Sequence, residues 1–232
     1  MNPRSPALAL LGCALALGAG TAQARPSAAS LARKARTDAP ADPSHWFATR
    51  QGLLRVYQER AADKKDPPPD DDASGADAGP PPAGASCEVI ESTPKDGDQA
   101  ARTRESCTMI TGRKPKGGSV LTYELRESGI FMVEAKADGP AAPVKLERLL
   151  LPAPAHKGKS WSEKRGAVTL ERVIKSAGKS CSTADRKFGD CLVLSVTERS
   201  GGKVKRKYTE TYAAGVGLVE DAQWELIDVK GL

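Results

Sequence analysis

The sequence predicts a mainly β protein: one curved antiparallel sheet, half-barrel or barrel-like, of about ten strands and with little helix. Apolar and polar residues alternate with a period of two in many short segments, which is typical of strands that bury one face. Turn signals that contain glycine separate these segments at regular spacing. Long segments with the periodicity of an amphipathic helix are scarce, and the two short helix candidates are 28–36 and 44–52.

The alternation is clearest in two predicted hairpins. The first joins 120–127 to 130–137 through a turn at Ser128-Gly129, and the second joins 191–198 to 203–212 through Ser200-Gly201-Gly202. In the first hairpin the residues expected to face inward are Leu121, Tyr123, Leu125, Phe131, Val133 and Ala135. Further strands are expected, in chain order, at 53–59, 87–91, 106–112, 144–151, 168–175, 217–220 and 223–229.

The first 24 residues have the organisation of an export signal. The apolar run over 7–19 is shorter than the ~20 residues that span a bilayer, and Ala22-Gln23-Ala24 fits a signal-peptidase site. Cleavage between Ala24 and Arg25 is predicted, which makes the mature protein periplasmic or secreted. The alternative is lipidation of Cys13, because Leu10-Leu11-Gly12-Cys13 resembles a lipobox, and this would anchor the protein to the outer membrane. Only about six apolar residues precede Cys13, and this short run favours the later cleavage.

Two segments have compositions that cannot form a packed core. Residues 25–43 are rich in Ala, Arg, Pro and Ser, and residues 61–85 contain three consecutive aspartates and two runs of three prolines. Because such segments bury too little apolar surface to offset the entropy of ordering, they are expected to be flexible. The predicted organisation is a signal peptide over 1–24, a flexible segment over 25–43, and a β domain over 44–232 that carries the disordered insert 61–85.

The four cysteines that follow the leader are Cys87, Cys107, Cys181 and Cys191. An even number of cysteines in an exported protein indicates disulfides. Metal binding is disfavoured because the sequence has no Cys-x-x-Cys pair and its two histidines are distant in sequence from the cysteines. Three connectivities exist, and local pairing of Cys87 with Cys107 and of Cys181 with Cys191 is predicted. A hairpin around the turn at 93–97 would place the first two opposite each other, and the last two close a short loop over 182–190.

The net charge of +6 is modest and arises partly from short basic runs, of which 203–207 is one. Solvated loops and strand faces account for such runs. Nucleic acid is not expected as a partner, because the protein is predicted to be exported and has few aromatic residues among the basic ones. The partner is left open, with an envelope lipid or an envelope protein as the alternatives.

No catalytic residue, metal site or cofactor is predicted. The Gly-Lys-Ser tripeptides at 158–160 and 178–180 each lack the first glycine of a phosphate-binding loop. The sequence contains no Gly-x-Ser-x-Gly elbow, so neither His45 nor His156 has a serine nucleophile in the motif that is typical of a hydrolase triad. Large aromatic residues are expected to pack in the core rather than to bind a ligand: Trp46, Tyr57, Trp161, Tyr212 and Trp224.

The segment Tyr212-Ala-Ala-Gly215-Val-Gly217-Leu-Val219 is the most distinctive of the chain. Gly215 and Gly217 are expected to adopt backbone angles closed to other residues or to allow another strand to approach closely. With Trp46-Phe47, Gly158-Lys-Ser-Trp161 and Phe188-Gly-Asp-Cys191, this segment resembles the TapB-like exported bacterial proteins. The chain departs from that pattern at Ala214, in its 61–85 insert and in the Cys87/Cys107 pair. The resemblance implies a curved β-sheet and an envelope location, and it implies no reaction.

The expected function is a non-enzymatic binding or structural role in the cell envelope. The alternative is a periplasmic lipid or lipoprotein carrier with a concave apolar sheet face, as in LolA-like half-barrels, and a hydrolase comes third. An apolar cavity would favour the carrier, and a filled core would favour the structural role. Convergent polar groups with perturbed pKa values in a pocket would favour an enzyme.

Overall fold

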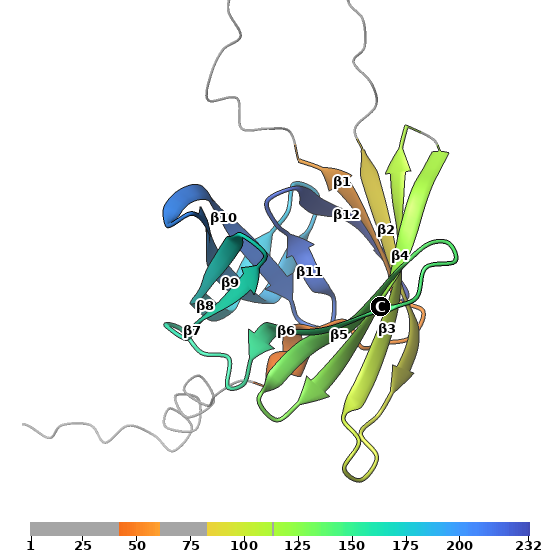
Figure 1. Ribbon diagram of the computed structural model, residues 1–232, viewed down its shortest axis with the longest axis horizontal. Coiled ribbons are helices and arrows are strands. Elements are labelled where there is room, and N and C mark those ends of the chain that lie inside the picture. The colour runs from red at the N-terminus through yellow and green to blue at the C-terminus, as the bar shows by residue number, and fades with distance from the viewer. Residues whose placement is uncertain (1–41, 61–82, 113) are drawn as a thin grey trace, which may run out of the picture. The chain divides into compact units, whose positions relative to one another are not determined.

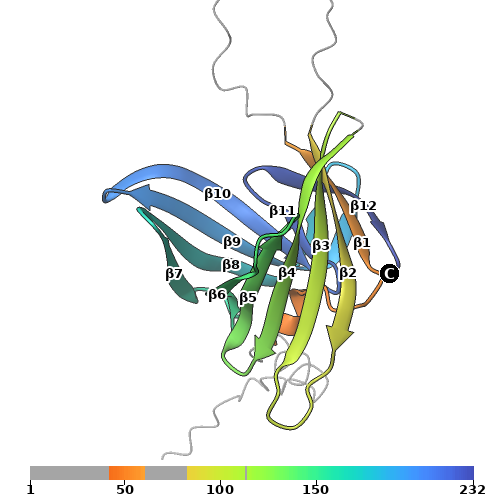
Figure 2. The ribbon, with the colours of Figure 1, turned by 45° about the vertical axis from the view of Figure 1, so that its right-hand side comes forward.

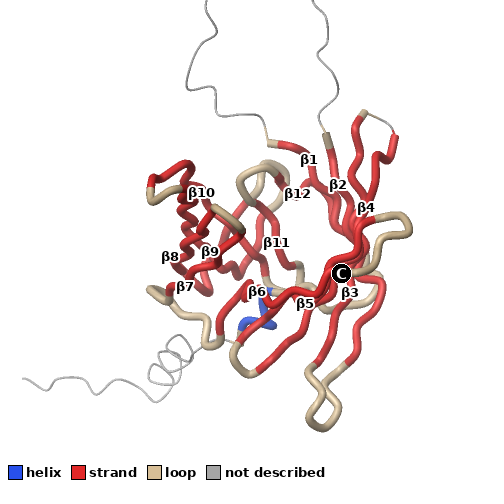
Figure 3. Tube along the Cα trace, in the orientation of Figure 1, coloured by secondary structure: helices blue, strands red, loops and turns tan. Residues whose placement is uncertain are grey.

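The computed structural model describes residues 42–60, 83–112 and 114–232. Contacts divide the chain into two compact units, 1–38 and 39–232, and all described residues belong to the second. The described residues of that unit form a short 3₁₀-helix, η1 (Pro43–Trp46), and a single sheet of twelve antiparallel strands (Figures 1 and 3). The strands are β1 (Leu54–Glu59), β2 (Gly84–Thr93), β3 (Ala101–Thr111), β4 (Lys114–Arg126), β5 (Gly129–Ala137), β6 (Val144–Pro152), β7 (Ser160–Arg165), β8 (Val168–Ser182), β9 (Lys187–Ser200), β10 (Lys203–Ala213), β11 (Gly217–Glu220) and β12 (Trp224–Lys230). The predicted fold class is confirmed, with twelve strands instead of about ten.

The sheet is a meander whose first and last strands are neighbours. Its order is β6-β5-β4-β3-β2-β1-β12-β11-β10-β9-β8-β7, so every hydrogen-bonded pair except β1–β12 joins strands that follow one another in the chain. The strands β1–β6 form one arm and β7–β12 form the other, and the two arms curve around a common interior (Figures 1 and 2). The sheet is therefore a nearly closed barrel.

The two edge strands, β6 and β7, meet at a seam bridged by side chains. The indole Nε1 of Trp161 in β7 donates a hydrogen bond to the carbonyl oxygen of Leu149 in β6, over 3.2 Å. Arg148 Nε lies 3.3 Å from Glu163 Oε1. In the part of the chain that the structure describes, no backbone ladder joins β6 to β7.

The hydrophobic core fills part of the interior. It is built mainly from inward-facing residues of β8 and β9, together with residues of the first arm and of η1: Leu170, Ile174, Leu192, Leu194, Val196, Ile130, Leu151 and Trp46. Trp46 is 1% exposed, and its Nε1 donates a hydrogen bond to Asp190 Oδ1 over 2.9 Å. The helix begins after Asp42, whose side chain accepts a hydrogen bond from the Ser44 amide. It is shorter than the helix expected over 44–52, and the candidate at 28–36 lies outside the described residues.

The predicted inward face of β5 is wrong. Ile130 and Met132 pack in the core, whereas the guanidinium of Arg126 lies 4.6 Å from the ring centre of Phe131, and Val133 lines a groove on the outer face. The pairing of β4, β5 and β6 contains register shifts, including one between Ile130 and Phe131. A bulge adds one residue to one strand, so strict alternation along the sequence no longer identifies the buried face.

Two further expectations need correction. Strand β7 was not expected, because Trp161 is the only large apolar residue in its sequence Ser-Trp-Ser-Glu-Lys-Arg. The insert expected over 61–85 is outside the described residues at 61–82, and its last two residues belong to β2, where Gly84 pairs with Gln58 and Ala85 with Tyr57. The described residues contain no helix long and apolar enough to cross a membrane.

Candidate functional site

The interior contains a cavity of about 400 Å³ beside the core. Both arms line it, and most of its wall is apolar or aromatic. The aliphatic, methionine and phenylalanine residues of this wall are Phe47, Ala85, Met109, Leu121, Met132, Leu150 and Leu218. The wall of the interior cavity also contains three basic and three acidic residues: Arg55, Arg165, Arg172, Glu105, Glu210 and Asp221.

The first buried ion pair of the cavity joins Arg55 in β1 to Glu105 in β3, across the intervening strand β2. Arg55 Nη2 and Glu105 Oε1 are in contact, and each side chain is only 5% exposed. Arg55 Nε is buried and has no hydrogen-bond partner among the described residues. The pair therefore satisfies only part of the hydrogen-bonding capacity of the guanidinium, which has five donors.

Burial governs the ionisation of the groups around this pair. It raises the pKa of Glu105, and the charge of Arg55 opposes that shift. Burial also raises the pKa of Tyr57 to about 12 and that of Tyr123 well above its usual value of 10, to which the charge of Glu105 contributes further. These tyrosines are neutral at physiological pH, and the Tyr57 hydroxyl donates a hydrogen bond to the Leu218 carbonyl over 2.8 Å.

The second buried ion pair joins Arg172 in β8 to Glu210 in β10, again across one strand. Arg172 Nε and Nη2 donate to the two carboxylate oxygens of Glu210, each over 3.2 Å, in a bidentate arrangement. Arg172 Nη1 lies 3.2 Å from Glu163 in β7, and Glu163 also contacts Arg165 and Arg148. The second pair is thus part of a network that extends to the seam between β6 and β7.

The network holds Arg172 and Glu163 in their charged forms. Burial alone would lower the pKa of Arg172, but the charge of Glu210 and its hydrogen bonds outweigh that effect and raise it. Burial alone would raise the pKa of Glu163, but the hydrogen bonds and charges of Arg165 and Arg172 hold it below its usual value. The Tyr212 hydroxyl donates to Glu210 Oε2 over 3.3 Å, and burial raises its pKa well above 10.

This arrangement can bind a ligand that is partly apolar and partly polar. The apolar wall offers surface for a hydrocarbon or aromatic group, and the buried pairs offer a few fixed polar atoms, which is the usual composition of small-molecule sites. Four of the charged groups are committed to each other in arginine–glutamate pairs. Within the described residues, no group of three or more His, Cys, Asp or Glu side chains is placed to hold a metal ion.

The structure contains disulfides between Cys87 and Cys107 and between Cys181 and Cys191. The first links directly opposed positions of β2 and β3, and both of its cysteines line the interior cavity. The second links β8 to β9. Cys13, Ala24 and Arg25, predicted for lipidation or cleavage, lie outside the described residues.

Gly215 and Gly217 both have positive φ angles, +70° and +89°. The Gly215 amide donates a hydrogen bond to the carbonyl oxygen of His45 over 2.9 Å. At Gly217 a Cβ atom would lie 2.9 Å from Arg55 Nη1 and 3.3 Å from Ala48. Gly217 therefore allows the chain to pass closely beside the first ion pair. His45 Nε2 lies 2.8 Å from Asp190 Oδ2 at the surface, outside the cavity wall.

Sequence reasoning missed the four residues of the buried pairs. Three of the aromatic residues expected to serve only for packing, Tyr57, Tyr212 and Trp224, also line the cavity. A usable signal was present in two strands. Arg172 is two positions from both Leu170 and Ile174, and Glu210 is two positions from both Tyr208 and Tyr212, so each charged residue shares a strand face with large apolar or aromatic residues. A charged residue on the apolar face of a strand indicates a buried polar contact, because unpaired burial of a charge is too costly.

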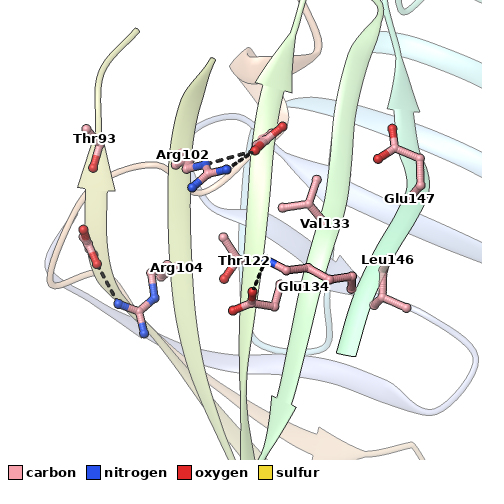
Figure 4. A pocket seen from close by; sticks show the side chains of 11 residues that line it. Thr93, Arg102, Arg104, Thr122, Val133, Glu134, Leu146 and Glu147 are labelled. Carbon is pink, nitrogen blue, oxygen red and sulfur yellow. Dashed lines mark hydrogen bonds and ion pairs between the residues drawn. The ribbon is translucent and has the colours of Figure 1, made fainter. Parts of the chain in front are cut away.

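A second hollow, of about 480 Å³, lies on the outer face of β2–β6 (Figure 4). Its charged residues form exposed pairs across neighbouring strands, among them Arg104 with Glu91 over 2.8 Å and Lys145 with Glu134 over 2.9 Å. Exposed pairs of this kind contribute about 0–1 kcal/mol each. We interpret this groove as a surface ladder of ion pairs, and the interior cavity is the candidate site.

No protein-family model matches the chain, and no curated protein matches it. Two solved structures are similar to it. One, from Bacteroides fragilis, is a predicted exported protein with a YmcC-like fold; it has a TM-score of 0.47 and 11% identity, over 80% of this chain and 98% of the other. The second is a predicted lipoprotein from Parabacteroides distasonis, with a TM-score of 0.42 and 15% identity, over 82% of this chain and 100% of the other. Similarity at this level carries no functional inference.

Proposed function

We propose that this protein is a non-enzymatic binding protein of the cell envelope that holds a small amphipathic ligand in its interior cavity. The observation that supports the proposal most is the cavity itself, which is hollow beside an otherwise packed core. A purely structural role would require no such space. The envelope location rests on the predicted export signal and on the resemblance to TapB-like proteins.

The wall of the cavity favours a single-chain lipid or a similar amphiphile. Its volume of about 400 Å³ is within the range of small-molecule sites, roughly 300–1,000 Å³. Phe47, Leu121 and Met132 offer apolar surface, and the ion pairs lie in the same wall. Ligands of this class are those that a lipid carrier would transport, so the proposal includes the carrier role as its most specific form.

The same polar groups also satisfy one criterion for a catalytic site, because several have shifted pKa values in a cavity. A binding role accounts for them better. Glu105 and Glu210 are each held by an arginine, and burial keeps Tyr57, Tyr123 and Tyr212 protonated. None of these groups combines an activated nucleophile with an adjacent free base, which covalent catalysis requires.

Fluorescence titration with N-phenyl-1-naphthylamine, followed by displacement with fatty acids and lysophospholipids, tests the proposal. Trp224 in the cavity wall provides an energy-transfer donor for the probe. Met132→Trp and Leu121→Phe, which fill the cavity, should each weaken probe binding at least about tenfold (about 1.4 kcal/mol). Val144→Trp is the matched control, because Val144 is 60% exposed at the start of β6.

Two results would overturn the binding role. One is a folded wild-type protein that binds neither the probe nor any amphiphile. The other is equal affinity in the cavity variants, the control and the wild type, since the probe would then sit elsewhere. Turnover of ester or glycoside substrates that Glu105→Gln abolishes would support the hydrolase alternative instead.

A further inference from the structure

One end of the second arm carries a cluster of lysines without acidic partners. Lys203, Lys205 and Lys207 in β10 are all exposed. Of the acidic residues near this end, Glu163 contacts Arg165 and Glu171 contacts Arg199, whereas Glu198, which lies opposite Arg206, forms no ion pair among the described residues. In the described part of the chain, none of the three lysines forms an ion pair. Their charge is therefore directed to solvent.

The strand register brings more positive charge to the same end. Arg165 pairs with Val168, Val168 with Ser200, and Ser200 with Lys203, so the β7–β8 and β9–β10 turns lie side by side. In the next row of paired residues across the four strands, Lys164 of β7 is at one end and Val204 of β10 is at the other. Figure 2 shows β7, β9 and β10 running to this common end.

Val204 adds an apolar side chain among the lysines. It is 44% exposed, one of the few large apolar residues of the described chain that faces solvent. A register shift between Val204 and Arg206 marks a bulge at Lys205. The bulge breaks the alternation of the strand, and all five residues from Lys203 to Lys207 are exposed.

We propose that this end of the second arm, formed by Lys164, Lys203, Lys205 and Lys207 around Val204, docks on an anionic lipid bilayer. Lysines that lack a local partner suit a diffuse negative surface, and each contributes about fivefold (about 1 kcal/mol) to binding near such a surface. Val204 and the aliphatic parts of the lysine side chains supply apolar contact at the interface.

Docking at this end also places the interior cavity next to the bilayer. Arg165 is the last residue of β7 and pairs with Val168 beside the turn, and Tyr208 follows the lysines in β10. Both residues line the cavity. The docking surface goes beyond the proposed binding function and stands without it, because it rests on exposed charges and not on the cavity.

Vesicle co-sedimentation tests the docking surface. Every variant carries Cys13→Ser, so that a lipid anchor cannot contribute to binding. Vesicles of phosphatidylcholine with added phosphatidylglycerol should bind the protein, and pure phosphatidylcholine should not. The triple variant Lys203→Gln/Lys205→Gln/Lys207→Gln should bind about 100-fold more weakly. In 1 M salt, where the Debye length is about 3 Å, binding of the wild type should be lost.

The matched control is Lys95→Gln/Lys114→Gln/Lys116→Gln, which removes the same charge from exposed lysines of the first arm. Its binding should stay within about twofold of the wild type if position and not net charge decides. Equal loss in both triple variants, or equal binding to neutral and anionic vesicles, would overturn the docking surface. So would retention of the protein by an anionic polysaccharide without any vesicle binding. The Lys203 triple variant should bind the fluorescent probe with the affinity of the wild type. A loss of vesicle binding then concerns the docking surface alone and is distinct from a failure of the cavity proposal.

Discussion

The two buried arginine–glutamate pairs have the same construction and different surroundings. In each, an arginine reaches over one strand to a glutamate two strands away on the inner face: β1 to β3 for Arg55–Glu105, and β8 to β10 for Arg172–Glu210. The first pair is isolated from other ion pairs among the described residues and leaves Arg55 Nε without a hydrogen-bond partner there. The second is bidentate and shares Glu163 with two further arginines. The first buried pair therefore depends on one ion-pair contact, whereas the second is supported by several.

Removing one member of the isolated pair should give the largest effect. Arg55→Met leaves Glu105 buried without its counter-ion, and we expect a loss of about 3–5 kcal/mol in the free energy of unfolding, measured by urea denaturation. The double variant Arg55→Met/Glu105→Leu should be more stable than the single one, because no charge remains buried. A double variant that loses the sum of both single effects would contradict this account.

Gly217→Ala should have the next largest effect, because it strains the backbone beside the same pair. Its φ of +89° is unfavourable for alanine, and the added Cβ would lie 2.9 Å from Arg55 Nη1. We expect a loss of about 2–3 kcal/mol, seen as a lower Tm. Gly215→Ala is the control, since it has φ of +70° but no atom within 4 Å, and should cost about 1 kcal/mol. Equal losses would show that the contact with Arg55 is unimportant.

The pH dependence of stability should have opposite signs for Glu105 of the first pair and for Glu163, which contacts Arg172 of the second pair. The pKa of Glu163 is held below 4.5 in the folded state, so its ionised form stabilises the fold above that pH and the contribution is lost as the pH falls. The pKa of Glu105 is raised, so its contribution is present at low pH and is lost as the pH rises above 4.5. Glu163→Gln should flatten the loss of stability on acidification, followed by circular dichroism from pH 6 to pH 3, about the range in which carboxylates titrate. An unchanged acid limb would exclude Glu163 from the acid response.

The exposed ladder of the first arm should give the smallest effect and sets the scale for the buried pairs. Lys145→Ala removes the partner of Glu134, and the Lys145 side chain is 86% exposed. We expect a change below about 0.5 kcal/mol in the free energy of unfolding, because solvent screens exposed pairs. A loss comparable to that of Arg55→Met would mean that this pair is stronger than its exposure indicates.

Local sequence patterns predicted much of the fold, but they did not predict the buried ion pairs of the interior or the inward face of β5. The hairpins, the turn glycines Gly215 and Gly217, and the pairings Cys87–Cys107 and Cys181–Cys191 depend on residues close in sequence. The inward face of β5 depends on bulges in its pairing with β4 and β6. The buried pairs join residues 50 and 38 positions apart. Such partners can be recognised as neighbours only when the strand order is known. No local pattern could therefore match Arg55 to Glu105.

The neighbouring positions of β1 and β12 also determine how this topology could be reconnected. Among the strands that the structure describes, β1 and β12 form the one hydrogen-bonded pair whose members are not consecutive in sequence, whereas β6 and β7 are consecutive and have no ladder between them. A circularly permuted chain that begins at β7, passes from β12 to β1 through a linker, and ends at β6 would pair every strand with its immediate neighbour in sequence. Because folding slows as contacts become more distant in sequence, this permutant should fold faster than the natural order in stopped-flow refolding, at the same barrel geometry.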